Sequence, residues 1–229
     1  IYIHIIRNLA IIRIIMDNIF PKIHNEGYRF LIIFAVVTII LYFIHGFLGF
    51  VGLVLTIWCY YFFRDPERLS IDDDNYLISP ADGTILQILE TNGPKELELE
   101  NKKFTKISIF MNVFDCHVNR TPCSGTVTEI LYKPGKFINA SLDKASEDNE
   151  RNYYKIKNNK GEEIIVVQIA GLIARRIVCE TKKEQELKQG SRIGMIRFGS
   201  RVDLYFENYK SLVKVNQKTI AGETLLASK

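Results

Sequence analysis

"GMIRFGSRVDLY", residues 194–205, joins two strand-like segments through a break at Gly199-Ser200. The first segment is apolar, and the second alternates polar and apolar residues, which is typical of a strand with one buried face. By itself the glycine favours a tight turn or a β-bulge, because glycine adopts backbone conformations that other residues resist. The stretch predicts β-structure near the C-terminus and raises the question of why a serine follows the glycine.

Similar strand-like segments recur from residue 83 onward. Turn signals such as Asn92-Gly93-Pro94 and Pro134-Gly135 separate them. We therefore expect an all-β or β-dominated domain, a sandwich or partly open barrel of hairpins. The polar residues 139–151 predict a loop with one helical turn. The strand-like segments are GTILQIL (83–89), KISIFMNV (106–113), GTVTEILY (125–132), EEIIVVQIAG (162–171), GMIRFG (194–199) and RVDLYF (201–206).

The N-terminal part of the chain is strongly apolar. Residues 30–63 contain no Asp, Glu, Lys or Arg, and His45-Gly46 divides them into two segments. Each segment is somewhat shorter than the roughly 20 residues of a straight membrane span, and the glycine allows a bend between them. We expect residues 1–64 to be a membrane-anchoring segment with an α-helical hairpin, and residues 65–229 to be the β-rich domain. The alternative is a buried helix pair in a soluble protein.

Basic residues flank this apolar run on both sides. They are Lys22 and Arg29 before it and Arg64 and Arg68 after it. Under the positive-inside rule, this symmetry places both ends of the hairpin on the cytoplasmic face of the cell membrane, together with the domain that follows. Residues 1–20 are also apolar, with a few interspersed charges, and predict an interfacial helix.

The overall composition excludes some classes of function. The 229 residues carry a formal net charge of +4, which is too small to indicate nucleic-acid binding and suits a surface that meets an anionic membrane. The four cysteines form no Cys-x-x-Cys pair, which predicts free thiols in a reducing compartment. Cys116, His117 and Cys123 lie close together, but their spacing matches no common zinc motif, so we expect no metal.

Three residues are candidates for nucleophilic chemistry: Asp82, His117 and Ser200. Asp82 precedes a glycine, as in an ordinary turn, and a lone histidine is commonly structural. Together, however, an aspartate can orient an imidazole, and the imidazole can take the proton of a serine hydroxyl. The chain lacks the G-x-S-x-G elbow of an α/β-hydrolase, which argues against a serine hydrolase.

A serine directly after a glycine has another use. The hydroxyl of Ser200 can attack the Gly199 carbonyl and convert the peptide to an ester, and glycine offers that carbonyl with the least hindrance.

The roles of two other short segments remain open. PGKFINAS (134–141) is a loop as a bare pattern. Arg175-Arg176 place positive charge in an apolar strand pattern, where they either bind a phosphate or carboxylate or face solvent.

Six motifs in a fixed order together resemble the phosphatidylserine decarboxylase family, in its short, membrane-anchored bacterial form. The resemblance covers roughly residues 25–229 and implies a proenzyme that cuts its own chain between Gly199 and Ser200. Ser200 then becomes an N-terminal pyruvoyl group, and fragments 1–199 and 200–229 stay associated. The motifs are FFRDPER (62–68), SPADG (79–83), HVNRTP (117–122), PGKFINASLDKASEDNER (134–151), QIAGLIARRIV (168–178) and RFGSRVD (197–203).

The resemblance also implies the reaction and the roles of the site residues. The enzyme is a carboxy-lyase that converts phosphatidylserine to phosphatidylethanolamine through a Schiff base with the pyruvoyl carbonyl, which accepts the electrons left by CO2. Asp82 resembles the acidic member of the self-processing triad, and His117 resembles the proton donor in decarboxylation. Longer family members carry a second histidine where this chain has Arg120. We expect His117 to serve in both steps.

A non-enzymatic alternative follows from SPADGTI (79–85), which is similar to the entry of biotinyl- and lipoyl-type β-sandwich domains. The chain would then be a membrane-tethered adaptor. Carrier domains display a modifiable lysine in a tight hairpin, commonly between methionines, and no such lysine stands out. The sequence leaves open the acyl-chain preference, related serine phospholipids as substrates, and whether the chain forms a homo-oligomer.

Overall fold

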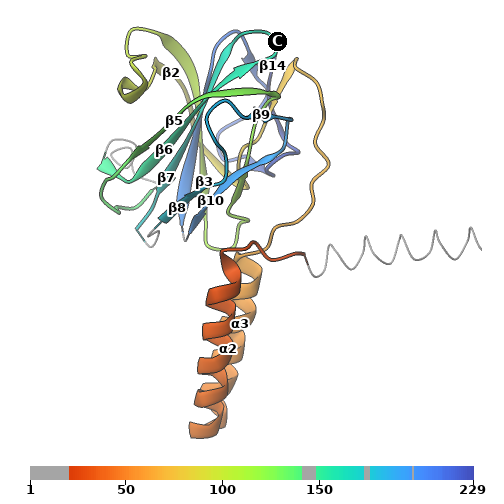
Figure 1. The fold of residues 1–229 in the computed structure, drawn as a ribbon, viewed down its shortest axis with the longest axis vertical. Helices are drawn as coiled ribbons and strands as arrows, with labels where there is room; N and C mark the ends of the chain where they lie inside the picture. Colours follow the sequence, from red (N-terminus) through yellow and green to blue (C-terminus); the bar gives the residue numbers. More distant parts are fainter. Residues whose placement is uncertain (1–20, 141–147, 173–175, 198) are drawn as a thin grey trace, which may run out of the picture. The chain divides into compact units, whose positions relative to one another are not determined.

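The computed structural model describes residues 21–140, 148–172, 176–197 and 199–229 (Figure 1). The chain divides into two compact units, residues 1–67 and 68–229. The interfacial helix expected at residues 1–20 lies outside the described residues, as does part of the polar loop expected at 139–151.

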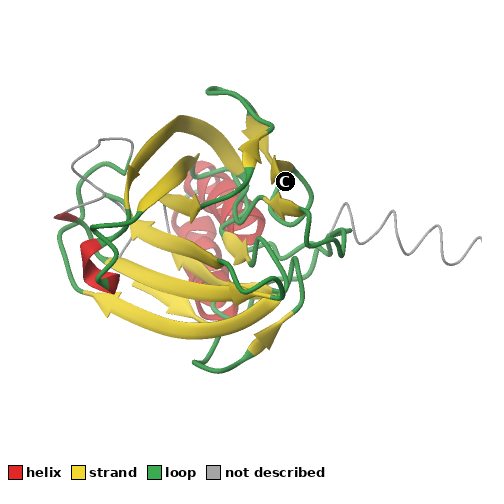
Figure 2. Cartoon of the chain, turned by 90° about the horizontal axis from the view of Figure 1, so that it is seen from above, coloured by secondary structure: helices red, strands yellow, loops and turns green. Residues whose placement is uncertain are grey.

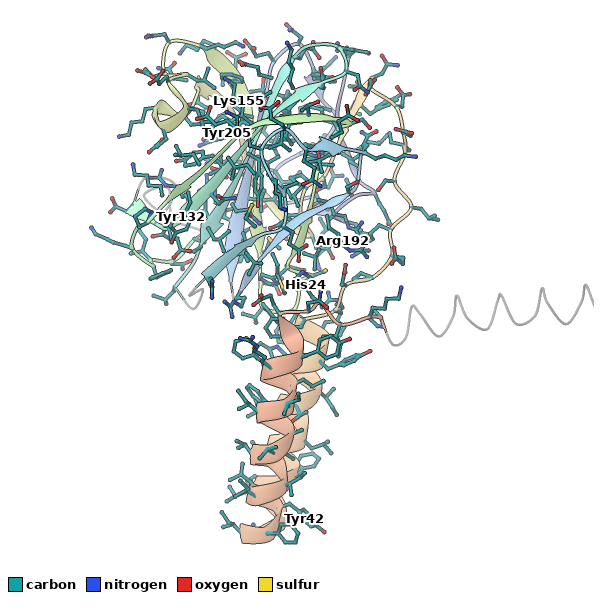
Figure 3. All side chains as sticks on the ribbon, in the orientation of Figure 1. His24, Tyr42, Tyr132, Lys155, Arg192 and Tyr205 are labelled. Carbon is teal, nitrogen blue, oxygen red and sulfur yellow. The ribbon has the colours of Figure 1, made fainter. Side chains whose placement is uncertain are left out.

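The first unit holds a pair of helices, α2 (Gly27–Ile44) and α3 (Gly46–Phe62). His45 separates them with an extended backbone, and its Nδ1 accepts the Phe47 N–H at the start of α3. The helices pack closely because Gly49 has no side chain: a β-carbon there would lie 2.7 Å from the Tyr42 Cα. Tyr42 lies near the tip of this hairpin (Figure 3).

The outer surfaces of both helices are apolar. Phe43 is 83% exposed, and many Ile, Val, Leu and Phe side chains along the pair are also exposed. Among the described residues, α2 is the one helix that is long and apolar enough to cross a membrane by length and composition. At 1.5 Å per residue its 18 residues extend about 27 Å. Exposed apolar surface of this extent suggests that the N-terminal unit anchors the chain in a membrane.

The second unit is β-rich, and its largest sheet has eight antiparallel strands in the order β13-β2-β3-β11-β7-β6-β5-β9. Figure 2 shows this sheet curling around on itself into a half-barrel. The strands are β2 (Gly83–Asn92), β3 (Lys103–Met111), β5 (Gly125–Lys133), β6 (Arg151–Asn158), β7 (Glu163–Ala170), β9 (Glu186–Leu187), β11 (Ser200–Phe206) and β13 (Lys218–Thr219).

Two small antiparallel sheets complete the unit. One has the order β1-β14-β12, with β1 (Tyr76–Ile78), β14 (Leu225–Ser228) and β12 (Lys210–Ser211). The other has the order β4-β10-β8, with β4 (Val118–Arg120), β10 (Arg192–Arg197) and β8 (Arg176–Cys179). The main core lies against the curled sheet and includes Ile107, Val202 and Leu204. A second cluster lies around Phe104, Tyr153 and Val167, and it includes Leu97 from the short helix η1 (Lys95–Leu97).

The structure confirms the expected fold class, a β-rich domain preceded by two helices. The six strand-like segments coincide with parts of β2, β3, β5, β7, β10 and β11. Strand β6 was missed because its two tyrosines are adjacent and two lysines flank its one isoleucine, so the sequence shows no clear apolar face, although most of its residues are buried. The break at Gly199-Ser200 is more than a local turn, because β10 and β11 belong to different sheets. The chain changes sheets at this glycine.

Candidate active site

Ser200 is the first residue of β11, in the middle of the eight-stranded sheet. It pairs with Met111 on β3 and with Ala170 on β7, and it is completely buried. Its Oγ donates to the Met111 Sδ at 3.4 Å. The hydroxyl is therefore shielded from solvent, with a thioether as its hydrogen-bond partner.

Gly199 has the left-handed backbone that the sequence pattern anticipated. Its φ is +59°, which a residue with a β-carbon rarely adopts. The Gly199 carbonyl oxygen packs so closely on Gly171 that a β-carbon on Gly171 would overlap it. The chain is continuous at Gly199-Ser200, and the carbonyl that the serine would attack is held by a neighbour without a side chain.

His117 precedes β4 and is completely buried. Its Nδ1 lies 2.9 Å from the Asp115 carbonyl oxygen. Because a carbonyl only accepts hydrogen bonds, Nδ1 carries the proton in the neutral ring, and Nε2 is the atom that can gain one. The His117 carbonyl in turn accepts the Ile196 N–H at 3.3 Å, which holds His117 beside the strand that leads to Gly199.

Asp82, just before β2, has both carboxylate oxygens engaged. Oδ2 lies 2.9 Å from the Arg68 Nη2, and Oδ1 accepts the Ala221 N–H at 2.7 Å. Both side chains of this ion pair are largely buried. Arg68 belongs to the motif FFRDPER, but the sequence alone predicted no role for it at the site. The one feature of the sequence that could have indicated such a role is that Arg68 ends a motif rich in charged residues.

Strand β4 connects the surroundings of Asp82 to those of Ser200. The Asn119 Nδ2 lies 3.4 Å from the Pro80 carbonyl oxygen and 3.6 Å from the Met111 Sδ, and Met111 contacts the Ser200 Oγ. On its other side, Asn119 Oδ1 accepts from the Gln168 Nε2 at 2.8 Å. Strand β4 is thus linked through Pro80 and Met111 to the segments that carry Asp82 and Ser200, and His117 directly precedes it; the described hydrogen bonds of the three side chains go to Arg68 and Ala221, to Asp115 and to Met111.

The amide network behind Asn119 ends at a tyrosine. The Tyr154 hydroxyl donates to the Gln168 Oε1 at 2.8 Å. Burial raises the pKa of Tyr154 well above its usual value, so the hydroxyl stays protonated and remains a donor. Every member of this network is buried, which gives Asn119 a fixed orientation.

Arg120 fills the position where longer family members carry a histidine. Its Nη1 donates to the Gly190 carbonyl at 2.8 Å, and its side chain packs beside Gly222. Only 5% of the residue is exposed. A guanidinium does not lose its proton in proteins, so Arg120 cannot take over the base function of a histidine.

Comparison with known proteins identifies the family. The model of the family described as phosphatidylserine decarboxylase matches residues 55–227. This chain belongs to the phosphatidylserine decarboxylase family. A relative from Pelagibacter ubique, the phosphatidylserine decarboxylase proenzyme, is 76% identical over 93% of this chain and 100% of its own length. Proenzymes of the same name from Cereibacter sphaeroides and Ruegeria pomeroyi are each 51% identical, over 93% and 92% of this chain and 92% and 97% of their own lengths.

Proposed function

We propose that Gly199-Ser200 is the self-cleavage site and that Ser200 is the precursor of the cofactor. The chain is a phosphatidylserine decarboxylase proenzyme, a carboxy-lyase that forms phosphatidylethanolamine from phosphatidylserine with a pyruvoyl group made by self-cleavage. The proposal assigns these steps to residues. The observation that carries it is the buried Ser200 hydroxyl beside a left-handed Gly199 whose carbonyl packs on Gly171.

The proposed cleavage conserves atoms and electrons at each step. The Ser200 Oγ attacks the Gly199 carbonyl carbon, the C–N bond breaks, and an ester joins the two residues. Loss of the Ser200 α-proton then breaks the Cβ–O bond and leaves Gly199 as a carboxylate. The unsaturated residue 200 rearranges to an imine, and water releases ammonia to leave the pyruvoyl group, whose carbonyl supplies the electron sink for decarboxylation.

We assign the proton transfers to His117 and the orientation of the processing site to Asp82. Imidazole exchanges protons near neutral pH, and His117 lies beside the strand that enters the cleavage site. The Arg68 guanidinium and the Ala221 N–H hold the Asp82 carboxylate in one orientation. A fixed negative charge of this kind acts on processing through its neighbours rather than by moving a proton itself.

The strand order supports association of fragments 1–199 and 200–229 after cleavage. Strand β11 would begin the small fragment, yet it lies between β3 and β7 of the large fragment. Strand β14 likewise pairs with β1 of the large fragment. Cleavage and loss of the residue-200 nitrogen change only the first ladder position of β11, so we expect the two fragments to copurify.

We further propose that residues 1–64 anchor the enzyme and that residues 65–229 form the catalytic domain on the cytoplasmic face of the membrane. The apolar α2 and α3 and the basic residues on both sides of them support this arrangement. Digestion of the domain by a protease added to inside-out vesicles is the expected result. Protection in those vesicles would contradict the cytoplasmic assignment.

Mass spectrometry of the purified protein tests the cleavage site, followed by a CO2-release assay with phosphatidylserine. The expected result is two fragments that end at Gly199 and begin at residue 200, the smaller with a blocked N-terminus. A single uncut chain that releases no CO2 would favour the adaptor alternative. Cleavage at another bond would overturn the assignment of Ser200.

A further inference from the structure

Strands β8 and β10 place two arginines directly opposite each other. Their antiparallel register pairs Arg176 with Arg197. Side chains of directly opposed residues lie on the same face of the sheet, and like charges in that position are destabilising. Arg176 is exposed and Arg197 is partly buried. An anion between them would relieve this repulsion.

A second arginine pair of the same sheet shows how the protein avoids such repulsion elsewhere. Arg192, at the other end of β10 (Figure 3), pairs with Arg120. There the Arg120 guanidinium donates to the Gly190 carbonyl. Arg176 has no comparable arrangement: among the described residues, no hydrogen bond or ion pair holds its guanidinium.

Glu150, an acidic group that acts electrostatically on the same tyrosine as Arg176, is already engaged. The Glu150 Oε1 accepts the Ile177 N–H at 3.2 Å. Its carboxylate also hydrogen-bonds to the Tyr132 hydroxyl, and together with burial it raises the pKa of that tyrosine, whereas the positive charge of Arg176 lowers it. The exposed Arg176 guanidinium therefore keeps the capacity to bind an anion such as a singly charged phosphodiester.

The arginine pair also lies at the right place in the chain. Arg197 lies three positions before Ser200, so their Cα atoms are at most about 11 Å apart. In phosphatidylserine only an ester oxygen and one methylene separate the phosphorus from the α carbon that loses CO2. A substrate at Ser200 therefore brings its phosphate close to this end of β10. We propose that Arg176 and Arg197 bind the phosphodiester of the substrate head group.

This inference rests on the proposed role of Ser200 and adds a recognition site to it. The phosphodiester is unchanged by decarboxylation, so the two arginines would hold the substrate and the transition state equally. Uniform binding of this kind lowers KM and leaves kcat unchanged. The planar guanidinium fork also suits two phosphate oxygens better than a lysine does.

The test uses the cleaved enzyme in neutral detergent micelles that contain phosphatidylserine. Arg176→Gln and Arg197→Gln are each expected to raise KM about tenfold, the scale of one charge-assisted hydrogen bond, while kcat stays within about twofold. Arg176→Lys should recover part of the loss. The matched control is Lys183→Gln, which removes one positive charge from an exposed turn and should leave both constants unchanged.

Two additions distinguish the possible sources of the anion. Inorganic phosphate should inhibit the wild-type enzyme competitively and the two arginine variants less. Phosphatidylglycerol, an anionic lipid that is not the substrate, should act in the same way. If the variants instead lose only their binding to phosphatidylglycerol vesicles and keep the wild-type KM, the pair is a general membrane contact and the inference is wrong.

A binding measurement tests the inference even if the arginine variants fail to cleave themselves. In the uncut Ser200→Ala chain, binding of soluble glycerophosphoserine should weaken about tenfold when Arg176→Gln is added. Equal binding would overturn the inference. A wild-type KM for both arginine variants would do so as well, without affecting the assignment of Ser200. Cleavage of the Ser200→Ala chain would instead overturn the proposed function.

Discussion

The two faces of strand β11 differ in chemistry although both are buried. On one face, Ser200 is followed by Val202, Leu204 and Phe206, which belong to the main core. The opposite face carries Arg201 and Asp203, which form a two-point ion pair with N–O distances of 2.6 and 3.0 Å. The Ser200 hydroxyl, the proposed nucleophile, contacts a thioether, and an ion pair lies on the other side of the same strand.

This difference shows how one strand can both hold its place and present the proposed nucleophile. Burying an ion pair costs about as much desolvation energy as the attraction returns, so the pair adds little to stability by itself. It does specify register. A slip by one residue would move Arg201 into the main core and Ser200 out of it. The charged face therefore determines where the serine lies, without placing a charge beside it.

The largest effect is expected on the reactive face. Ser200→Ala should leave an uncut chain with no decarboxylase activity, because no hydroxyl remains to attack Gly199. Intact mass and CO2 release measure this. The matched control is Ser108→Ala, which removes a serine hydroxyl that accepts from the Arg201 Nη2 at 2.8 Å. That variant should cleave normally and lose about 1–2 kcal/mol of stability.

His117→Ala should reduce decarboxylation by about 10²–10⁴-fold, the usual contribution of a general acid or base. If His117 is also the base for cleavage, the variant accumulates as an uncut chain. Single-turnover CO2 release from the cleaved fraction separates the two steps. Normal cleavage without activity would show that Ser200 is activated by another group. Wild-type rates for both steps would make His117 a structural residue.

The next largest effect is expected at the Asp82–Arg68 ion pair. Asp82→Asn should slow self-cleavage, while the enzyme that does mature keeps substantial activity. Arg68→Gln should slow cleavage in the same way because it releases the Asp82 carboxylate, and Arg68→Lys should restore part of the rate. Pulse-chase measurement of fragment formation provides the rates. Rapid cleavage in both the Asp82→Asn and the Arg68→Gln variants would exclude a role for this pair in processing.

On the charged face, Asp203→Ala should lower the free energy of unfolding by about 3–5 kcal/mol, because Arg201 would remain buried without its partner. Urea unfolding of the uncut Ser200→Ala chain measures this without interference from the cut. Replacing both partners, as in Arg201→Met with Asp203→Leu, should recover most of the loss. A small effect of Asp203→Ala alone would mean that the ion pair does not hold β11.

The smallest effect is expected at the far end of β11, where Lys102 contacts both Glu163 and Glu207. Burial raises the pKa of Glu163, but Lys155 and Lys102 lower it more, so the net pKa is below the ordinary value of 4.5. Its contribution is therefore present above about pH 4.5 and is lost as the pH falls through the lowered pKa. Glu163→Gln should cost about 1 kcal/mol or less at pH 7, since the group is partly exposed. Urea unfolding at a series of pH values from 7 downward should show the difference shrink as the pH falls through the lowered pKa.

The sequence predicted the local secondary structure well and the contacts between distant segments poorly. Gly199-Ser200 was recognisable because glycine and serine are adjacent, and β11 because its alternation has a period of two. Strand β6 was missed because its buried tyrosines and lysine stems do not form a simple apolar stripe. Arg68 was missed as the partner of Asp82 because their ion pair joins segments with a strand between them.

The sequence by itself determined the apolar helices, most of the strands and the glycine–serine bond, because each depends on neighbouring residues and on the period of the backbone. Only the tertiary structure decided that the chain changes sheets at Gly199, that Gly171 lies against the Gly199 carbonyl, and that Arg176 faces Arg197. These contacts depend on strand order and register. Strand order and register are set by how the whole sheet buries its core, and no single segment carries that information.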